Sequence, residues 1–162
     1  MTKKIVFLAL HLSYGGTERA IISEANMLVK RYEVEIISFY HLCDKPAFEV
    51  DPRVKITYLT EGLKPNRDEI KNAIKSKRPL QLLKECSKSI KILYLRTTSM
   101  KKAIKKSNGD VLISTRYLYH KLVTENAKDG VVCIAQEHNH HNNNEEYIKK
   151  QIESVKQMDY FM

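Results

Sequence analysis

The fold is decided by residues 5–29, which begin Ile5-Val-Phe-Leu-Ala-Leu-His-Leu-Ser-Tyr-Gly-Gly-Thr-Glu-Arg-Ala20. Their first part, Ile5 to Leu10, contains six consecutive apolar residues and predicts a strand that is buried on both faces. Gly15-Gly16 interrupts this run. From Thr17 onward, apolar residues recur at helical spacing: Ile21, Ala25 and Leu28. The stretch therefore predicts a strand, a glycine turn and a helix.

The glycine turn has the chemistry of an anion site. Gly15 and Gly16 permit backbone conformations closed to other residues and allow another group to approach closely. The helix behind them supplies unpaired N–H groups and the positive end of its dipole. Such a corner can hold a phosphate or a carboxylate. A Gly-Gly pair also fits a plain tight turn, so both interpretations stay open here.

The turn Gly15-Gly16-Thr17-Glu18-Arg19, with the strand before it and the apolar positions through Leu28, carries a resemblance. It resembles the opening of the large retaining glycosyltransferase family of GT-B fold (family 4, group 1). The resemblance implies the N-terminal half of an enzyme that transfers a sugar from a nucleotide-diphosphate-sugar donor to an acceptor, with retention at the anomeric carbon.

The remaining patterns predict an α/β fold with a Rossmann-like, mostly parallel sheet flanked by helices. Strands are expected at residues 34–39, 54–59, 111–114 and 131–135. Helices are expected at 69–106, with an interruption near Pro79, at 117–128, and after the N-cap Asn144. Helical connections between strands favour parallel pairing with right-handed crossovers.

The chain is expected to be one domain, because 162 residues can bury a substantial core. It ends inside an apolar run, residues 159–162, which predicts a further strand and a domain truncated near its end. The resemblance makes residues 1–162 the N-terminal, acceptor-side domain. It also implies a C-terminal nucleotide-binding domain with a Glu-x₇-Glu segment, which has no counterpart in this sequence. We therefore expect little or no transferase activity from this chain alone.

Cysteine content and hydropathy predict a cytoplasmic protein. The three cysteines, Cys43, Cys86 and Cys133, are far apart and form no CxxC pair, so we expect free thiols, with Cys133 in the core. No stretch approaches the roughly 20 apolar residues needed to span a bilayer.

The net charge of +9 is concentrated in one region. Twelve Lys and Arg residues but a single acid, Glu85, lie between Lys71 and Ser107. Such a region attracts anionic lipid, polyanionic polymer or nucleic acid, and a solvated helical surface is the alternative. It suggests an acceptor on the inner membrane face, where the protein would be peripheral, or an acceptor that is an anionic polymer, with nucleic acid the less favoured partner.

The same region carries apolar residues at helical spacing. One group is Leu82, Leu83 and Cys86, and the other is Ile90, Leu93, Thr97, Met100 and Ile104. We expect these stripes to pack in the core. An amphipathic helix lying flat on a membrane interface is the alternative.

Ligands of open α/β sheets bind beyond the carboxyl ends of the strands. Three segments are expected there: residues 11–17, 114–119 and 136–144. The resemblance implies that His138 is catalytic and contacts the donor sugar, and that Gly15 and Gly16 approach the donor phosphate. An ordinary loop histidine is the alternative for His138. Position alone suggests four residues for the acceptor side: Tyr14, Arg116, Tyr117 and Asn139.

No metal or cofactor is expected. The spacing of His138, His140 and His141 is poor for zinc, because all three lie in one loop without nearby cysteines. P-loop, GxGxxG and GxSxG motifs are absent. The expected partners are a nucleotide-sugar and a glycan, lipid or polymer acceptor. A second hypothesis is a stand-alone basic α/β module that binds nucleic acid or anionic lipid, and a flavodoxin-like regulatory protein ranks third.

Overall fold

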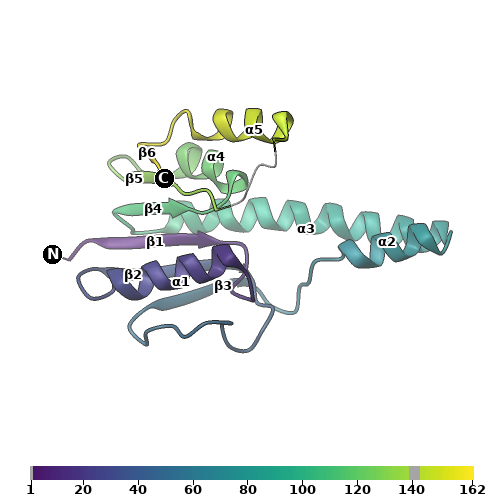
Figure 1. Ribbon diagram of the computed structural model, residues 1–162, viewed down its shortest axis with the longest axis horizontal. Coiled ribbons are helices and arrows are strands. Elements are labelled where there is room, and N and C mark those ends of the chain that lie inside the picture. Colours follow the sequence, from purple (N-terminus) through teal and green to yellow (C-terminus); the bar gives the residue numbers. More distant parts are fainter. Residues whose placement is uncertain (1, 139–142) are drawn as a thin grey trace.

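The computed structural model describes residues 2–138 and 143–162. Its core is a six-stranded sheet in the order β3-β2-β1-β4-β5-β6, in which every neighbouring pair is parallel (Figure 1). The strands are β1 (Lys4–Ala9), β2 (Glu33–Tyr40), β3 (Lys55–Thr60), β4 (Val111–Ser114), β5 (Val132–Ala135) and β6 (Tyr160–Phe161). The helices are α1 (Gly16–Leu28), α2 (Arg67–Lys75), α3 (Pro79–Lys106), α4 (Tyr117–Asn126) and α5 (Glu145–Val155). This is the strand order of the dinucleotide-binding sheet, and its switch point lies between β1 and β4.

The predicted elements are confirmed to within one or two residues at most ends. The predicted interruption of the long basic helix is real, since α2 ends before Pro79, which opens α3. Proline is favoured at this first helical position because it has no N–H to leave unpaired. The Asn144 side chain accepts a hydrogen bond from the Tyr147 amide at 2.9 Å and so caps α5, as predicted.

β1 is buried along its whole length. This confirms the buried strand predicted at residues 5–10, which ends at Ala9. Its alternate residues Ile5, Phe7 and Ala9 belong to the cluster that α1 covers, whereas Val6 and Leu8 belong to the cluster under α3 and α4. The α1 residues in the first cluster include Ile21, Ile22 and Ala25. The second cluster includes Ile92, Met100, Ile104, Tyr119 and Val123. Each large aliphatic side chain buried here stabilises the fold by about 1.5–3 kcal/mol.

The expected core packing of the apolar residues of α3 is correct for Met100 and Ile104 but wrong for Leu83, Cys86, Ile90 and Leu93. The latter two are 68% and 50% exposed. The reason is the length of α3, since 28 residues span about 42 Å and exceed the sheet. The first half of α3 projects with α2 past the carboxyl ends of the strands (Figure 1). No helix in the described ranges has both the length and the apolarity required to cross a bilayer.

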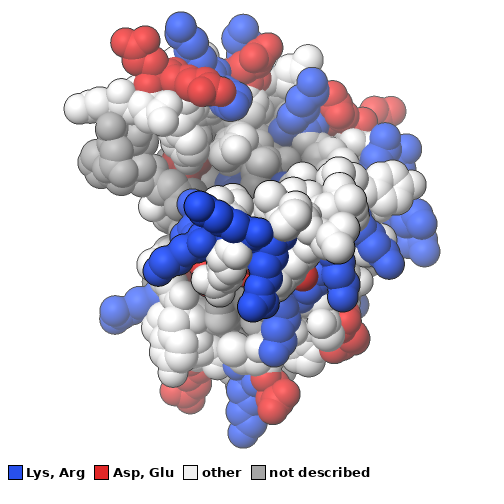
Figure 2. Space-filling view, turned by 90° about the vertical axis from the view of Figure 1, so that its right-hand side faces the viewer, with Lys and Arg blue, Asp and Glu red and all other residues white. Residues whose placement is uncertain are grey.

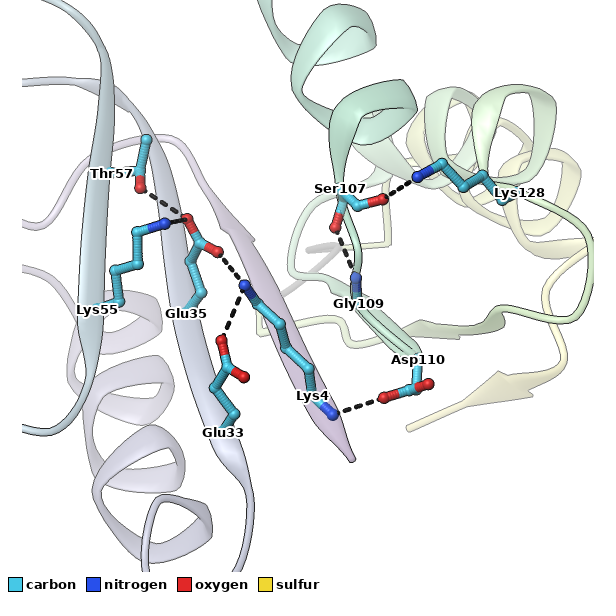
Figure 3. Close-up of polar contacts among 9 residues, drawn as sticks. All are labelled: Lys4, Glu33, Glu35, Lys55, Thr57, Ser107, Gly109, Asp110 and Lys128. Carbon is cyan, nitrogen blue, oxygen red and sulfur yellow. Dashed lines mark hydrogen bonds and ion pairs between the residues drawn. The ribbon is translucent and has the colours of Figure 1, made fainter. Parts of the chain in front are cut away.

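A buried ion network joins three strands at the amino edge of the sheet (Figure 3). The Lys4 Nζ atom lies 2.8 Å from Glu35 Oε2 and 3.1 Å from Glu33 Oε1. Glu35 Oε1 accepts a hydrogen bond from Thr57 Oγ1 at 2.7 Å and lies 3.2 Å from Lys55 Nζ. Burial by itself would raise the pKa of Glu35, but its hydrogen bonds from Lys4, Thr57 and Lys55 outweigh burial and lower that pKa.

The turn before β4 closes against β1 at this same edge. The Lys4 backbone N–H donates a hydrogen bond to Asp110 Oδ2 at 2.7 Å, and the Gly109 N–H donates to Ser107 Oγ at 3.1 Å (Figure 3). A Cβ at Gly109 would lie 2.7 Å from Val6 Cγ2. Only glycine therefore lets the turn approach β1 this closely.

Replacing Glu35 with Gln is expected to lower the free energy of unfolding by about 3 kcal/mol at neutral pH, because the buried Lys4 ammonium loses its closest carboxylate. The folded-state pKa of Glu35 is depressed below its ordinary value of 4.5. Its contribution is therefore present above that value and is lost as the pH falls through the folded-state pKa. Urea unfolding at a series of pH values should show the wild type and the variant converging in acid.

The matched control is Glu33→Gln, since the Glu33 side chain is 59% exposed. It is expected to cost less than about 1 kcal/mol. An E35Q effect that stays constant from neutral pH into acid would contradict the role given to the Glu35 carboxylate.

Candidate active site

Three loop segments meet at the carboxyl edge of the sheet. Residues 11–17 follow β1, residues 114–119 begin at the end of β4, and residues 136–138 follow β5. Because β1, β4 and β5 are parallel neighbours, their following loops emerge on one edge. This confirms the predicted convergence of these segments, as far as the described residues extend. In sheets of this strand order the ligand crevice lies at the switch point, which here falls between the loops that follow β1 and β4.

A buried ion pair bridges this crevice. Arg116 Nη2 lies 3.0 Å from Glu18 Oε1, and the Glu18 side chain is only 3% exposed. Beside it, Thr115 Oγ1 donates a hydrogen bond to the Leu8 carbonyl oxygen at 3.0 Å. A carboxylate buried to this degree requires a cationic partner to offset its desolvation. The ion pair therefore ties the turn before α1 to the turn before α4.

His11 completes a three-residue charged cluster with Glu18 and Arg116. Its Nδ1 atom lies 3.5 Å from Glu18 Oε1 and 3.0 Å from Ser13 Oγ. Burial lowers the pKa of His11, and Arg116 lowers it further, although Glu18 acts in the opposite direction. His11 is therefore neutral at pH 7, and the ion pair beside it is balanced.

The two glycines of the turn differ in their surroundings. A Cβ on Gly15 would overlap Glu18 Oε2, so the carboxylate packs directly over this residue. Nothing lies within 4 Å of a Cβ built on Gly16, the first residue of α1. Open space at a helix N-terminus suits an approaching anion. The predicted phosphate role of Gly15 and Gly16 stays a prediction, and of the two Gly16 faces the open space.

His138 is the first exposed residue beyond β5. The backbone before it is fixed, because the Gln136 N–H donates to the Ser114 carbonyl at 2.9 Å and the Glu137 N–H donates to the Met162 carbonyl at 3.1 Å. The histidine is thus presented at the carboxyl edge by a rigid segment. Its catalytic role stays a prediction.

The two tyrosines suggested for the acceptor side lie in the first and second of these segments. Tyr14 is exposed and meets Phe48 edge-on, with ring centroids 6.0 Å apart. Tyr117 is half-buried and meets Tyr147 edge-on at 5.5 Å. Both rings offer a surface on which a sugar can stack, and their role stays a prediction.

Asn139, His140 and His141 lie outside the described residues, so the structure does not bear on the acceptor role of Asn139. Within residues 2–138 and 143–162, no three His, Cys, Asp or Glu side chains are grouped so that they could hold a metal ion. The expectation of chemistry without a metal stays a prediction.

Sequence reasoning missed His120, which is fully buried behind the crevice. Its Nδ1 atom lies 2.6 Å from Ser114 Oγ. Burial lowers the pKa of His120 to about 4, against the opposing effect of Glu137. The imidazole is therefore neutral at pH 7 and serves to join α4 to the end of β4. Sequence reasoning also missed the pairing of Glu18 with Arg116. The available signal was the Gly-Gly-Thr-Glu-Arg turn, which contains Glu18 but not Arg116.

Comparison with known sequences finds no matching family model. The exopolysaccharide phosphotransferase of Streptomyces coelicolor is 29% identical over 131 residues, which are 76% of this chain and 14% of that protein. The GalNAc-α-(1→4)-GalNAc-α-(1→3)-diNAcBac-PP-undecaprenol α-1,4-N-acetyl-D-galactosaminyltransferase of Campylobacter jejuni is 30% identical over 111 residues, 68% of this chain and 25% of that protein. The chain thus spans a quarter or less of the length of these curated relatives.

A solved structure extends the comparison to almost the whole chain. The apo form of the lipopolysaccharide outer core galactosyltransferase WaaB aligns with 98% of this chain and 38% of its own, with a TM-score of 0.56 and 14% identity. At this identity the likeness concerns the fold. The chain has the Rossmann-like α/β fold of GT-B glycosyltransferases, and its similarities to named glycosyltransferases support sugar transfer.

Replacing Gly15 with Ala is expected to destabilise the protein by about 1–2 kcal/mol, because the added Cβ displaces the Glu18 carboxylate from Arg116. Gly16→Ala is the matched control and should stay within about 0.5 kcal/mol of the wild type. Chemical unfolding measures both. In a Glu18→Ala background the cost of G15A should fall toward zero, and an unchanged cost would refute the overlap as its cause.

Replacing Arg116 with Gln is expected to raise the pKa of His11, because the positive charge of Arg116 lowers it. The rise should be partial, since burial is the larger cause and persists. Glu18→Gln should move the pKa of His11 downward. Titration of the His11 ring protons by NMR measures both shifts, with the exposed Lys121→Gln as a control of equal charge change. A downward shift in R116Q would contradict this electrostatic arrangement.

Proposed function

We propose that this chain is the N-terminal, acceptor-side domain of a glycosyltransferase that moves a sugar from a nucleotide-diphosphate-sugar donor to an acceptor, with retention at the anomeric carbon. The observation that carries the proposal is the arrangement at the switch point of the sheet, where the Gly15-Gly16 turn and the buried Glu18–Arg116 pair lie at the same edge as the segment 136–138 after β5. The similarity to a galactosaminyltransferase supports the same chemistry.

The donor diphosphate would approach the N-terminus of α1 on the open side of Gly16, where N–H groups are free to bind it. His138 would hydrogen-bond the donor sugar or stabilise charge that develops at the reacting carbon. The neutral His11 and the paired Glu18 leave no unbalanced carboxylate at the turn to repel a diphosphate. This arrangement needs no metal.

The acceptor would lie on the side of Tyr14, Arg116 and Tyr117. Asn139, which directly follows His138 in the sequence, is the fourth acceptor candidate. The name of the Campylobacter relative describes a saccharide carried on diphosphoundecaprenol. We extend that substrate class to this chain and propose a glycan linked through phosphate to a lipid. Such an acceptor resides in a membrane, and we propose that the enzyme acts at the cytoplasmic face of that membrane.

The projecting helices α2 and α3 suit this location. Figure 2, which faces their tip, shows Lys and Arg side chains gathered over them, while most Asp and Glu side chains lie above and below. Such a surface favours contact with anionic lipid. A stand-alone lipid-binding module would use the same surface, but that function leaves the Glu18–Arg116 crevice unexplained.

A second domain is part of the proposal. The relatives are several times longer than this chain, and the nucleotide would be held mainly outside these residues. The 162-residue chain alone is expected to show little or no sugar transfer. Robust turnover by this chain alone would overturn the assignment of roles between the two domains.

In the protein made from the whole reading frame, His138→Ala is expected to lower kcat by about a hundredfold, with a much smaller change in the donor KM. The reason is that His138 would act on charge that develops during transfer. Steady-state assays with nucleotide-sugars measure the effect, and NMR of the product reports whether the anomeric configuration is retained.

His41→Ala is the matched control. His41 follows β2, and β2 lies three strand positions from β5. At the usual strand spacing these two strands are about 14 Å apart. The H41A variant should therefore leave kcat unchanged. Equal activity of H138A and wild type would remove the catalytic role of His138, and an inverted product would remove the proposed stereochemistry.

A further inference from the structure

A groove lies at the base of the projecting helices, where they meet the end of β2. Its volume is about 280 Å³. It is lined by Tyr40, Pro65, Asn66, Arg67, Ile70, Ser89, Ile92, Leu93 and Arg96. Apolar side chains from α2 and α3 thus share this groove with two guanidinium groups, and none of its lining residues is acidic.

The two arginines have no carboxylate partner among the described residues. The ion pairs of that part of the chain include neither Arg67 nor Arg96. Arg96 lines the groove together with Tyr40, the last residue of β2. Guanidinium groups bind phosphate with paired, charge-assisted hydrogen bonds.

Hydrogen bonds of a buried asparagine hold the wall of the groove, and they also engage the carboxylate of Glu85. The Asn66 side chain is buried and donates to both the Glu85 carbonyl and Glu85 Oε2 at 2.8 Å. Ser89 Oγ donates to Asn66 Oδ1, also at 2.8 Å. Asp68 and Glu69 follow Arg67 in α2, and Asp68 Oδ1 lies 3.8 Å from Lys71 Nζ. Neither of these acids nor Glu85 lines the groove, so its two arginines stay available to an external anion.

An exposed apolar track leads from the groove along α3. Its members share one side of the helix by their spacing, and all are largely exposed: Leu80, Leu83, Ile90 and Leu93. Leu93 belongs to both the groove and the track. An exposed apolar surface continuous with a cationic groove is complementary to a molecule that joins a phosphate to a hydrocarbon chain.

The groove lies at the same edge of the sheet as the Glu18–Arg116 pair. Tyr40 of the groove ends β2, Arg116 follows β4, and β1 alone separates these two strands. Tyr40 and Tyr119, in the first turn of α4, also belong to one buried cluster. A saccharide attached to a phosphate in the groove would therefore lie at the same edge as the Glu18–Arg116 pair.

We infer that this groove binds the phosphate of a lipid-linked acceptor, with Arg67 and Arg96 on the phosphate and the hydrocarbon chain along the α3 track. The inference rests on the proposed function for the identity of the attached saccharide. The binding itself is a property of this chain and requires neither a donor nor a second domain.

The probe is farnesyl phosphate below its micelle concentration, titrated calorimetrically into the 162-residue chain. We expect binding that Arg67→Gln with Arg96→Gln weakens by about tenfold or more. The matched control is Lys101→Gln with Lys102→Gln, which removes the same charge from exposed positions near the other end of α3 and should change the affinity less than about twofold. Equal losses in the two double variants would overturn the groove as the site.

Two further ligands and one further variant separate the sources of binding. Inorganic phosphate and farnesol should each bind at least about tenfold more weakly than farnesyl phosphate, because each lacks one half of the recognised chemistry. Leu93→Gln should weaken the binding of farnesyl phosphate but leave the binding of inorganic phosphate unchanged. If inorganic phosphate bound as tightly as farnesyl phosphate, the groove would be only an anion site. If farnesol bound as tightly, the groove would be only an apolar surface. Either result would overturn the inference.

Vesicles of phosphatidylcholine with about 30% phosphatidylglycerol distinguish a lipid headgroup surface from the groove. The arginine double variant should keep most of its vesicle binding, because the other basic residues of α2 and α3 supply it. Loss of vesicle binding with unchanged farnesyl phosphate binding would overturn the inference. Because these measurements need no turnover, an absence of sugar transfer by the full-length protein would refute the proposed function alone.

Discussion

The complete enclosure of β1 is the constraint on which the remaining structure depends. β1 pairs with β2 on one edge and β4 on the other, and clusters under α1 and under α3 and α4 cover its two faces. A strand enclosed in this way must be apolar over most of its length, as Ile5 to Ala9 are, and the helices that connect it to its neighbours favour parallel pairing. Every following loop is then delivered to the same edge. The location of the crevice follows from burial before any polar contact is considered.

The Glu18–Arg116 pair turns that edge into a defined site. A buried carboxylate beside the glycine turn would by itself repel a phosphate, and Arg116 removes that obstacle while joining the first and fourth strands through their loops. The position of the Glu18 carboxylate also explains why the two glycines differ in their surroundings. Gly15 accommodates the carboxylate, and Gly16 leaves the helix N-terminus accessible.

Local signals made most of the fold predictable. The apolar run at residues 5–10, Pro79 and Asn144 each mark a strand or a helix end through their own chemistry, and the structure has them as predicted. The pairing of Glu18 with Arg116 was not predictable, because it joins side chains 98 positions apart. The exposure of Ile90 and Leu93 also could not be read from the sequence. Helical periodicity tells which side of α3 is apolar but not where the sheet beneath it ends.

The network around Lys4 and Glu35 gives the two edges of the sheet opposite tolerances to change. At the amino edge, charges and the close Gly109 turn fix the registration of β1, β2, β3 and β4. At the carboxyl edge, the Glu18–Arg116 pair is the buried charged contact between loops. Loop residues outside that contact can be exchanged or lengthened with less folding cost, so substrate preference can diverge, in nature or by loop grafting, upon an unchanged scaffold.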